Sequence, residues 1–165
     1  LKFIQHLIER GHESVLEHEK ITVRFVVDRG VSHELVRHRI ASFSQESTRY
    51  CNYAKEKFGN EITLIQPPGL TYEQLELWER AMHVVEHTYL KLVEKGCSAQ
   101  IARSVLPTCL KTEIVVTANV REWRHIFRLR TAEAAHPQMR EVMIPLMLEL
   151  RDMIPVVFHD INANQ

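Results

Sequence analysis

The densest group of polar side chains lies between residues 34 and 50. It combines guanidinium groups with an imidazole, an amide and several hydroxyls: Glu34, Arg37, His38, Arg39, Ser42, Ser44, Gln45, Ser47, Arg49 and Tyr50. Guanidinium groups bind phosphate through paired hydrogen bonds, whereas amides and hydroxyls recognise the edge of a polar ring. The group therefore suits a ligand with a phosphate and a polar ring. A solvated helix face followed by a capped loop is the alternative.

A second group of cationic side chains lies between residues 119 and 130. Helical spacing places Arg121, Arg124, His125 and Arg128 on one side and Trp123, Ile126, Phe127 and Leu129 on the other, with Asn119 and Arg130 at the two ends. Four arginines within ten positions repel one another unless an anion or carboxylates face them. The counter-charge could be a ligand. It could instead come from acidic residues of a partner chain or of the helix predicted at 71–95.

Helices account for about half of the predicted structure. Apolar residues at helical spacing, with capping and terminating residues, predict helices at 3–9, 33–39, 71–95, 98–106, 121–129 and 137–153. Ser32 and Thr71 are the expected N-caps of the second and third helices, and Gly96 follows the third. Pro145 lies inside the last helix and is expected to kink or split it.

Three segments show the patterns of strands, at 20–28, 62–65 and 110–120. In the first, Ile21, Val23, Phe25 and Val27 alternate with more polar residues, which indicates a half-buried strand. Residues 42–50 have no clean period and are predicted to form a loop. The fold class is therefore α+β. We expect residues 1–165 to form a single domain with a small, mostly antiparallel sheet and packed helices.

The composition excludes several functional classes. The 165 residues carry 21 basic and 21 acidic side chains, a formal net charge of +0, which argues against generic coating of nucleic acid. The basic residues are 14 Arg and 7 Lys, so arginine sites for anions are the better expectation. The sequence contains neither GxGxxG nor GxxxxGK[ST], which disfavours Rossmann and P-loop folds.

Cysteine content and hydropathy indicate where such a protein would work. The 3 cysteines show no CxxC spacing, so a disulfide framework or zinc ribbon is not supported. No apolar run approaches the roughly 18–20 residues that a membrane span needs. We therefore expect a soluble cytoplasmic protein that has no membrane contact, no nucleic-acid partner and no metal site.

The run RHRIASFSQESTRY at 37–50 resembles the signature of the flavin-dependent thymidylate synthases. Three further segments fit the family at compatible positions: GHESVLEH at 11–18, IARSVLP at 101–107 and NVREWRHIFRLR at 119–130. The resemblance thus covers nearly the whole chain. Family members are usually somewhat longer at the N-terminus. Because the chain begins with Leu1 rather than Met, we expect an N-terminal segment to be missing.

This resemblance implies a fold, a reaction and a set of small-molecule partners. The fold would be the α+β homotetramer of the family, with active sites made from more than one subunit. The reaction would be reductive methylation of dUMP to dTMP. Methylenetetrahydrofolate would donate the carbon, NADPH would supply the reducing equivalents and bound FAD would mediate.

The resemblance also assigns residues by position. The FAD ligands would be Ser14, Arg37, His38, Arg39, Gln45, Asn119, Arg121 and His125. The dUMP ligands would be Glu34, Leu35, Val36, Arg37, Gln45, Glu46, Ser47, Thr48, Arg49, Arg103 and Arg130. Arg130 would have the catalytic role, because a guanidinium beside the uracil stabilises negative charge as N3 loses its proton. Ser47 would bind the nucleotide and would not attack it.

Several positions depart from the common family pattern. Many members have Asn-Glu where this chain has Ser44-Gln45, Gln in place of Glu34, and Thr in place of Ser14. These differences concern individual contacts. Two other functional classes use the same arginines: a non-enzymatic module that binds nucleotides or RNA, and a purely structural oligomer with ion pairs at its subunit interfaces.

Overall fold

The computed structural model describes residues 1–54 and 59–163, which divide into two compact units. Unit 1 comprises Leu1–Arg24, Leu35–Phe43 and Val115–Gln165, and unit 2 comprises Phe25–Glu34 and Ser44–Ile114. Among the described residues, no helix has the length and apolar character needed to cross a membrane.

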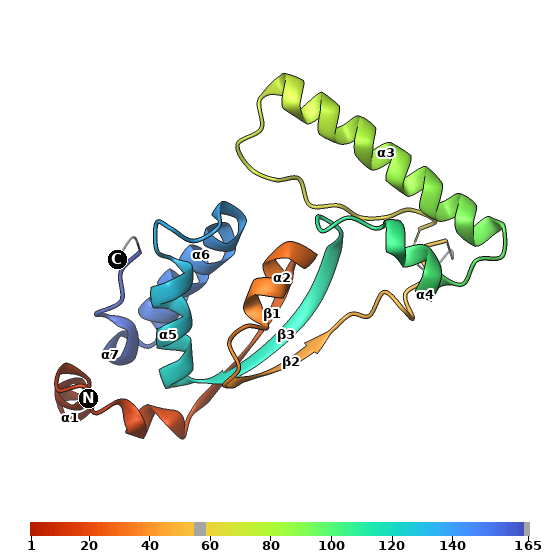
Figure 1. The fold of residues 1–165 in the computed structure, drawn as a ribbon. Helices are drawn as coiled ribbons and strands as arrows, with labels where there is room; N and C mark the ends of the chain where they lie inside the picture. The colour runs from red at the N-terminus through yellow and green to blue at the C-terminus, as the bar shows by residue number, and fades with distance from the viewer. Residues whose placement is uncertain (55–58, 164–165) are drawn as a thin grey trace. The chain divides into compact units, whose positions relative to one another are not determined.

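Three strands form one antiparallel sheet in the order β1–β3–β2 (Figure 1). They are β1 (Lys20–Asp28), β2 (Ala41–Gln45) and β3 (Lys111–Asn119), and each contributes residues to both units. The predictions for β1 and β3 are confirmed. Along β3 every second side chain is buried, including Ile114, Val116 and Ala118 as expected.

The structure corrects the other two predictions about strands. Residues 41–45 form β2 rather than the start of a loop: Phe43 and Gln45 are half-buried, whereas Ser42 and Ser44 are exposed. The hydroxyl-rich composition concealed this period of two. The predicted strand at 62–65 is reduced to one bridge between Leu64 and Leu110, and the prolines that follow cannot donate to a ladder.

Helix α2 (Arg29–Leu35), which follows β1, begins four residues earlier than the predicted helix at 33–39. Its N-terminus is capped by Asp28, whose Oδ1 accepts from the backbone N–H of Val31 at 2.7 Å. Ser32 is therefore not the cap; it lies inside the helix and its hydroxyl donates to the carbonyl of Arg29. Because the helix ends at Leu35, Glu34 and His38 do not share a helical face.

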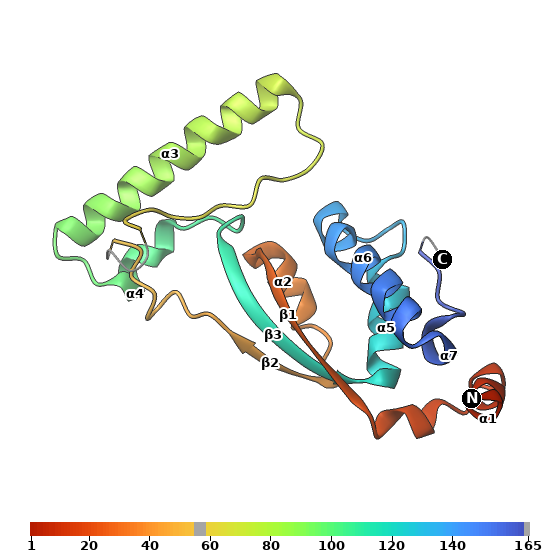
Figure 2. The same cartoon turned by 180° about the vertical axis from the view of Figure 1, so that it is seen from behind.

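Unit 1 contains α1 (Lys2–Glu9), the 3₁₀-helix η1 (Glu13–Glu17), α5 (Val120–Arg130), α6 (Pro137–Met153) and α7 (Pro155–Phe158). Figures 1 and 2 both show α5 lying against α6. In the core of unit 1, Trp123 and Phe127 of α5 have ring centroids 5.6 Å apart, and Phe158 of α7 lies 5.7 Å from Phe127. Helix α6 continues through Pro145, so the predicted split does not occur.

Unit 2 contains the long helix α3 (Tyr72–Glu94), followed by α4 (Ala99–Ala102) and the 3₁₀-helix η3 (Arg103–Val105). The capping prediction for α3 is confirmed: Thr71 and Gln74 form a reciprocal capping box. Gly96 follows the helix with φ +87°, a conformation that a side chain would strain.

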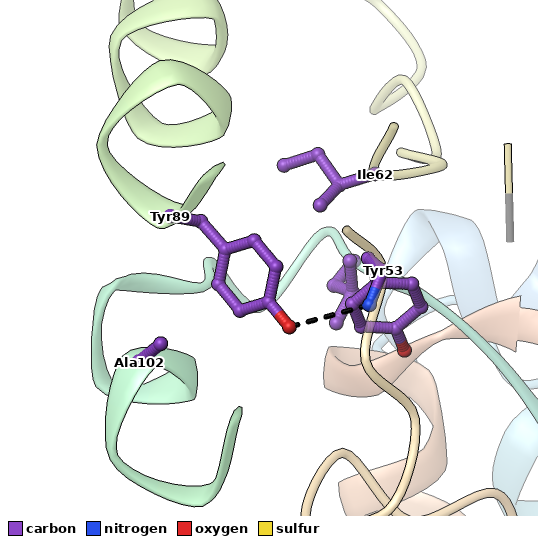
Figure 3. Packing of buried hydrophobic residues seen from close by; sticks show 5 residues of the cluster. Tyr53, Ile62, Tyr89 and Ala102 are labelled. Atoms are coloured by element: carbon purple, nitrogen blue, oxygen red, sulfur yellow. Dashed lines mark hydrogen bonds between the residues drawn. The ribbon is translucent and has the colours of Figure 1, made fainter. Parts of the chain in front are cut away.

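The core of unit 2 joins α3 and α4 to the segment that follows β2 (Figure 3). It consists of Tyr53, Ile62, Tyr89, Ala102 and Leu110. The hydroxyl of Tyr89 accepts a hydrogen bond from the backbone N–H of Tyr53 at 3.3 Å, and the two rings meet edge to face at 5.9 Å. This core fixes η3, which carries Arg103, relative to the loop that follows β2.

Candidate functional site

The two units divide the predicted site residues between them. Unit 1 holds the predicted FAD ligands except Gln45, namely Ser14, Arg37, His38, Arg39, Asn119, Arg121 and His125. It also holds Leu35, Val36 and Arg130 from the predicted dUMP set. Unit 2 holds Glu34, Gln45, Glu46, Ser47, Thr48, Arg49 and Arg103.

A cavity of about 540 Å³ in unit 2 and another of about 580 Å³ in unit 1 contain several of these residues. The unit 1 cavity lies between η1 and one side of α5 that extends to Arg128, and its walls include Asn119, Arg121 and His125. Three of the predicted FAD ligands therefore share one cavity. Glu13, Glu17 and Glu122 also line it, so its charge is mixed rather than purely cationic.

The N-terminus of α5 forms one wall of this cavity. Asn119 caps the helix, because its Oδ1 accepts from the backbone N–H of Glu122 at 2.8 Å. Arg121 is half exposed and forms an ion pair with Glu17. The positive end of a helix beside an exposed guanidinium is a setting that favours a phosphate or diphosphate.

His38 lies in the turn after α2 and is nearly completely buried, with 5% of its surface exposed. Its Nδ1 is 3.2 Å from Oε1 of Glu122, and its Nε2 accepts from Nε of Arg130 at 3.0 Å. Burial, reinforced by the charges of Arg130 and His125, lowers the pKa of His38 to about 4. The imidazole is therefore neutral at pH 7.

His38, Glu122 and His125 also offer ligand atoms that lie within 4.8 Å of one another, a spacing that a metal ion could use. Both ring nitrogens of His38 are already engaged, one by Glu122 and the other by Arg130. A cation would have to displace one of these contacts and would lie beside the positive guanidinium of Arg130. The expectation that this site binds no metal stays a prediction.

The lowered pKa of His38 makes folding sensitive to acid. Between pH 6.5 and about 4 the unfolded chain protonates this histidine and the folded chain does not. The free energy of unfolding is therefore highest above pH 6.5, where His38 is neutral in both states, and it decreases as the pH falls toward 4. We expect the free energy of unfolding to fall by at most about 3 kcal/mol across this window. Urea unfolding at several pH values measures it. His38→Gln should flatten that dependence, and an unchanged slope in this variant would contradict the assignment.

The structure corrects the predicted arrangement of α5. Arg124 is 0% exposed and lies on the buried side of the helix, whereas Leu129, predicted to be packed, is 49% exposed. Arg124 binds both carboxylate oxygens of Asp160 at 2.7 Å, Oε1 of Glu13 at 3.0 Å and the carbonyl of Val157. Its partners are thus acids of the same unit, and the helix at 71–95 does not supply them.

The cavity in unit 2 contains Arg103, which donates from Nη1 to the hydroxyl of Thr48 at 3.3 Å. Both residues belong to the predicted dUMP set. Arg29 and His33 also line this cavity and were missed in the sequence. They lie four positions apart on α2, a spacing that places side chains on one helical face. The incorrect helix start concealed this relation.

Gln45 is oriented by two buried hydroxyls. Its Nε2 donates to Oγ of Ser32 at 2.8 Å and to Oγ1 of Thr112 at 3.2 Å, and both partners are 0% exposed. A carboxylate at this position could accept but not donate, and the Ser32 hydroxyl already donates to the carbonyl of Arg29. This network provides a physical reason for glutamine in this chain.

Several of the remaining predicted dUMP ligands contact other residues of the chain. Glu46 accepts from the thiol of Cys51 at 3.4 Å and lies 3.8 Å from Nζ of Lys111. Ser47 accepts from the backbone N–H of Arg49 at 3.4 Å, and the Arg49 guanidinium lies over the Tyr50 ring. Leu35 is 1% exposed, so any contact with a nucleotide would come from its backbone.

Three further predicted positions carry exposed polar side chains. Arg37 and Arg39 flank the buried His38 in the turn after α2, and Ser14 lies in η1. Glu34 lies in the last turn of α2 and Val36 immediately follows that helix, with 39% of its surface exposed.

Comparison with known proteins indicates the same family as the sequence run at 37–50. The family model described as Thymidylate synthase complementing protein matches residues 1–156, which include parts of both units. A flavin-dependent thymidylate synthase from Geobacter sulfurreducens is 36% identical over 162 residues, covering 96% of this chain and 68% of that protein. Another, from Pyrococcus furiosus, is 34% identical over 160 residues, covering 94% and 66%. The chain thus spans about two thirds of the length of each relative.

The fold is also similar to a solved structure, that of the UMP/dUMP methylase PolB from Streptomyces cacaoi bound with 5-Br dUMP. The TM-score is 0.79 at 25% identity, covering 96% of this chain and 78% of that one. The family model, the two relatives and this structure agree with one another. The chain therefore belongs to the flavin-dependent thymidylate synthase family.

Proposed function

We propose that this protein catalyses the reductive methylation of dUMP to dTMP, with bound FAD, methylenetetrahydrofolate as carbon donor and NADPH as reductant. The observation that carries the proposal is the convergence of Asn119, Arg121 and His125 on one cavity in unit 1. In the same unit, His38 contacts Arg130. All five positions are ligand positions in the family resemblance.

The unit 1 cavity fits the requirements of FAD. The N-terminus of α5 and the half-exposed Arg121 would bind the diphosphate, with the ion pair to Glu17 exchanged for or shared with it. Ser14, Arg37 and Arg39 would add polar contacts from the surface of the same unit. Bound FAD would supply the hydride, so the chain itself needs no nucleophile for the reduction.

The unit 2 cavity fits the phosphate of dUMP. Arg103 would bind it with Thr48, and Arg29 and His33 add further cationic or donor groups to the same cavity. Ser47 and Arg49 would contact the nucleotide from the loop after β2. In the proposed homotetramer each active site would combine residues of more than one subunit.

Arg130 would act on the uracil ring. Its guanidinium would stabilise the negative charge that develops as N3 loses a proton, and this charge makes C5 a better nucleophile. An arginine is suited to this role because it stays protonated and presents donors in a rigid plane.

Formation of dTMP from dUMP by the purified protein tests the proposal. We expect product only when FAD, methylenetetrahydrofolate and NADPH are all present. A protein that binds dUMP but forms no dTMP under these conditions would contradict the enzymatic proposal. Affinity for oligonucleotides that falls steeply with salt would then support the non-enzymatic alternative.

Replacing Arg103 with alanine should raise the KM for dUMP about 10- to 100-fold, because a charge-assisted contact to phosphate is lost. FAD content should stay at the wild-type level, since the FAD ligands proposed in unit 1 are unchanged. Steady-state kinetics and the flavin absorbance measure the two quantities. Arg80→Ala, at an exposed position on α3, is the matched control. An unchanged KM in the Arg103 variant would remove Arg103 from the dUMP site.

A further inference from the structure

Glu122 is a buried acid for which the family resemblance gives no role. It lies in the first turn of α5, with 9% of its side chain exposed. Asn119 fixes its backbone by accepting from its N–H, and its carboxylate faces His38, 84 positions away in the sequence. A buried carboxylate needs a hydrogen-bond partner, and the imidazole of His38 is that partner for Glu122.

The contacts of His38 determine which of its nitrogens carries the proton. Nε of Arg130 can only donate a hydrogen bond, so Nε2 of His38 must accept at 3.0 Å. A neutral imidazole has one N–H, which must then be on Nδ1. That N–H points to Oε1 of Glu122 at 3.2 Å. Burial of His38, which lowers its pKa to about 4, agrees with a single proton on the ring.

We propose that Glu122 is a positioning residue that fixes the Nδ1–H tautomer of His38, so that Nε2 holds the guanidinium of Arg130. The contact engages Nε of Arg130 and not its terminal nitrogens. It therefore orients the guanidinium plane without using the fork that recognises a ligand. The effect on turnover rests on the proposed role of Arg130, whereas the tautomer does not.

Loss of the carboxylate would disturb this arrangement in a defined way. Without an acceptor at Nδ1, the tautomer protonated at Nε2 becomes competitive. An Nε2–H would face the N–H of Arg130, and two donors cannot form a hydrogen bond. The guanidinium would then turn away from His38, and a misplaced catalytic group lowers the rate even when it is present.

Nitrogen-15 NMR of histidine-labelled protein, with and without FAD, tests the tautomer directly. In the wild type we expect His38 to be protonated at Nδ1 and unprotonated at Nε2 at pH 7. Glu122→Gln keeps an acceptor oxygen and should preserve this pattern in part, whereas Glu122→Leu should shift it toward Nε2–H. A wild-type spectrum with Nε2 protonated would overturn the proposal, whether or not any variant folds.

Kinetics then test the consequence for the reaction. Glu122→Leu should lower kcat for dTMP formation about tenfold, because a catalytic group held in the wrong orientation loses part of its effect. The KM for dUMP should change little. In an Arg130→Ala background the same substitution should have no further effect, because the two residues act in one chain of contacts. Independent, additive losses would overturn the proposal.

Glu133→Leu, an exposed position shortly after α5, is the matched control and should change neither the NMR pattern nor kcat. Two separate results would refute the proposed role of Arg130 and the proposed role of Glu122. Full turnover by Arg130→Ala would refute the catalytic role of Arg130. Protonated Nε2 in the wild type would refute the role of Glu122.

Discussion

Replacing Arg130 with alanine should lower kcat for dTMP formation about 10²- to 10³-fold while the protein retains FAD. Removal of one group that stabilises developing charge typically has an effect of this size. FAD should remain because Asn119, Arg121 and His125 line a cavity that does not include Arg130. The measurement is steady-state turnover, normalised to flavin content from the absorption spectrum.

Two variants make this result specific. Arg130→Lys keeps the charge but loses the planar fork and the Nε donor that contacts His38, so it should recover only a small part of the activity. Arg151→Ala removes an arginine of α6 whose contact to Asn162 is long, 3.5 Å, and should behave as wild type. Turnover within a few-fold of wild type in Arg130→Ala would remove Arg130 from the catalytic role.

Replacing Arg124 with methionine should lower the free energy of unfolding by about 2–3 kcal/mol, because Asp160 and Glu13 lose the charge-assisted hydrogen bonds of a fully buried guanidinium. Arg124 is fully buried and binds Asp160 with two parallel hydrogen bonds of 2.7 Å. Burial alone would lower the pKa of Arg124, but Asp160 and Glu13 outweigh it and raise the pKa, so the guanidinium stays charged. Urea unfolding measures the loss.

Arg128 provides the control for this prediction. It reaches the same two acids at 3.4 and 3.5 Å, but its side chain is 43% exposed. Arg128→Met should therefore cost no more than about 1 kcal/mol. Adding Asp160→Asn to Arg124→Met should recover part of the loss, since it removes one uncompensated charge. Equal losses for the two variants would contradict the distinction between the buried Arg124 and the exposed Arg128.

Sequence patterns within a few positions correctly predicted several of the helices and strands. The alternation in β1 and β3 and the capping box at Thr71 all lie within a few positions of the structure that they specify. The helix α5 was predicted to within one residue at each end, at Val120–Arg130 instead of 121–129. These elements carry Asn119, Arg121, His125 and Arg130, so much of the candidate site in unit 1 could be predicted.

The errors arose where contacts between distant residues decide the structure. The first two N–H groups of helix α2, those of Arg29 and Gly30, donate to the carbonyls of Leu110 and Thr108 in the segment before β3. These acceptors are about 80 positions away in the sequence, and the local signal, Asp28 as N-cap, competes with Ser32. The inward orientation of Arg124 likewise depends on Asp160 and Glu13, which are 36 and 111 positions away.

Contacts between distant residues also explain why some functional residues could not be found from the sequence. Glu122 precedes the interior residue Trp123, and its role requires His38, which comes from the turn after α2. Arg29 and His33 become cavity residues only when the correct start of α2 is known. Motif positions were therefore easier to find than the residues that orient them.

The absorption spectrum of the purified protein, with and without dUMP, tests whether the chain binds both a flavin and the nucleotide. We expect protein-bound flavin bands, present on purification or after addition of FAD and removal of the excess, that shift when dUMP is added. Arg121→Ala should weaken FAD uptake, because Arg121 lies at the N-terminus of α5 in the proposed FAD cavity. A colourless protein that takes up no FAD and whose spectrum does not respond to dUMP would contradict the proposed function.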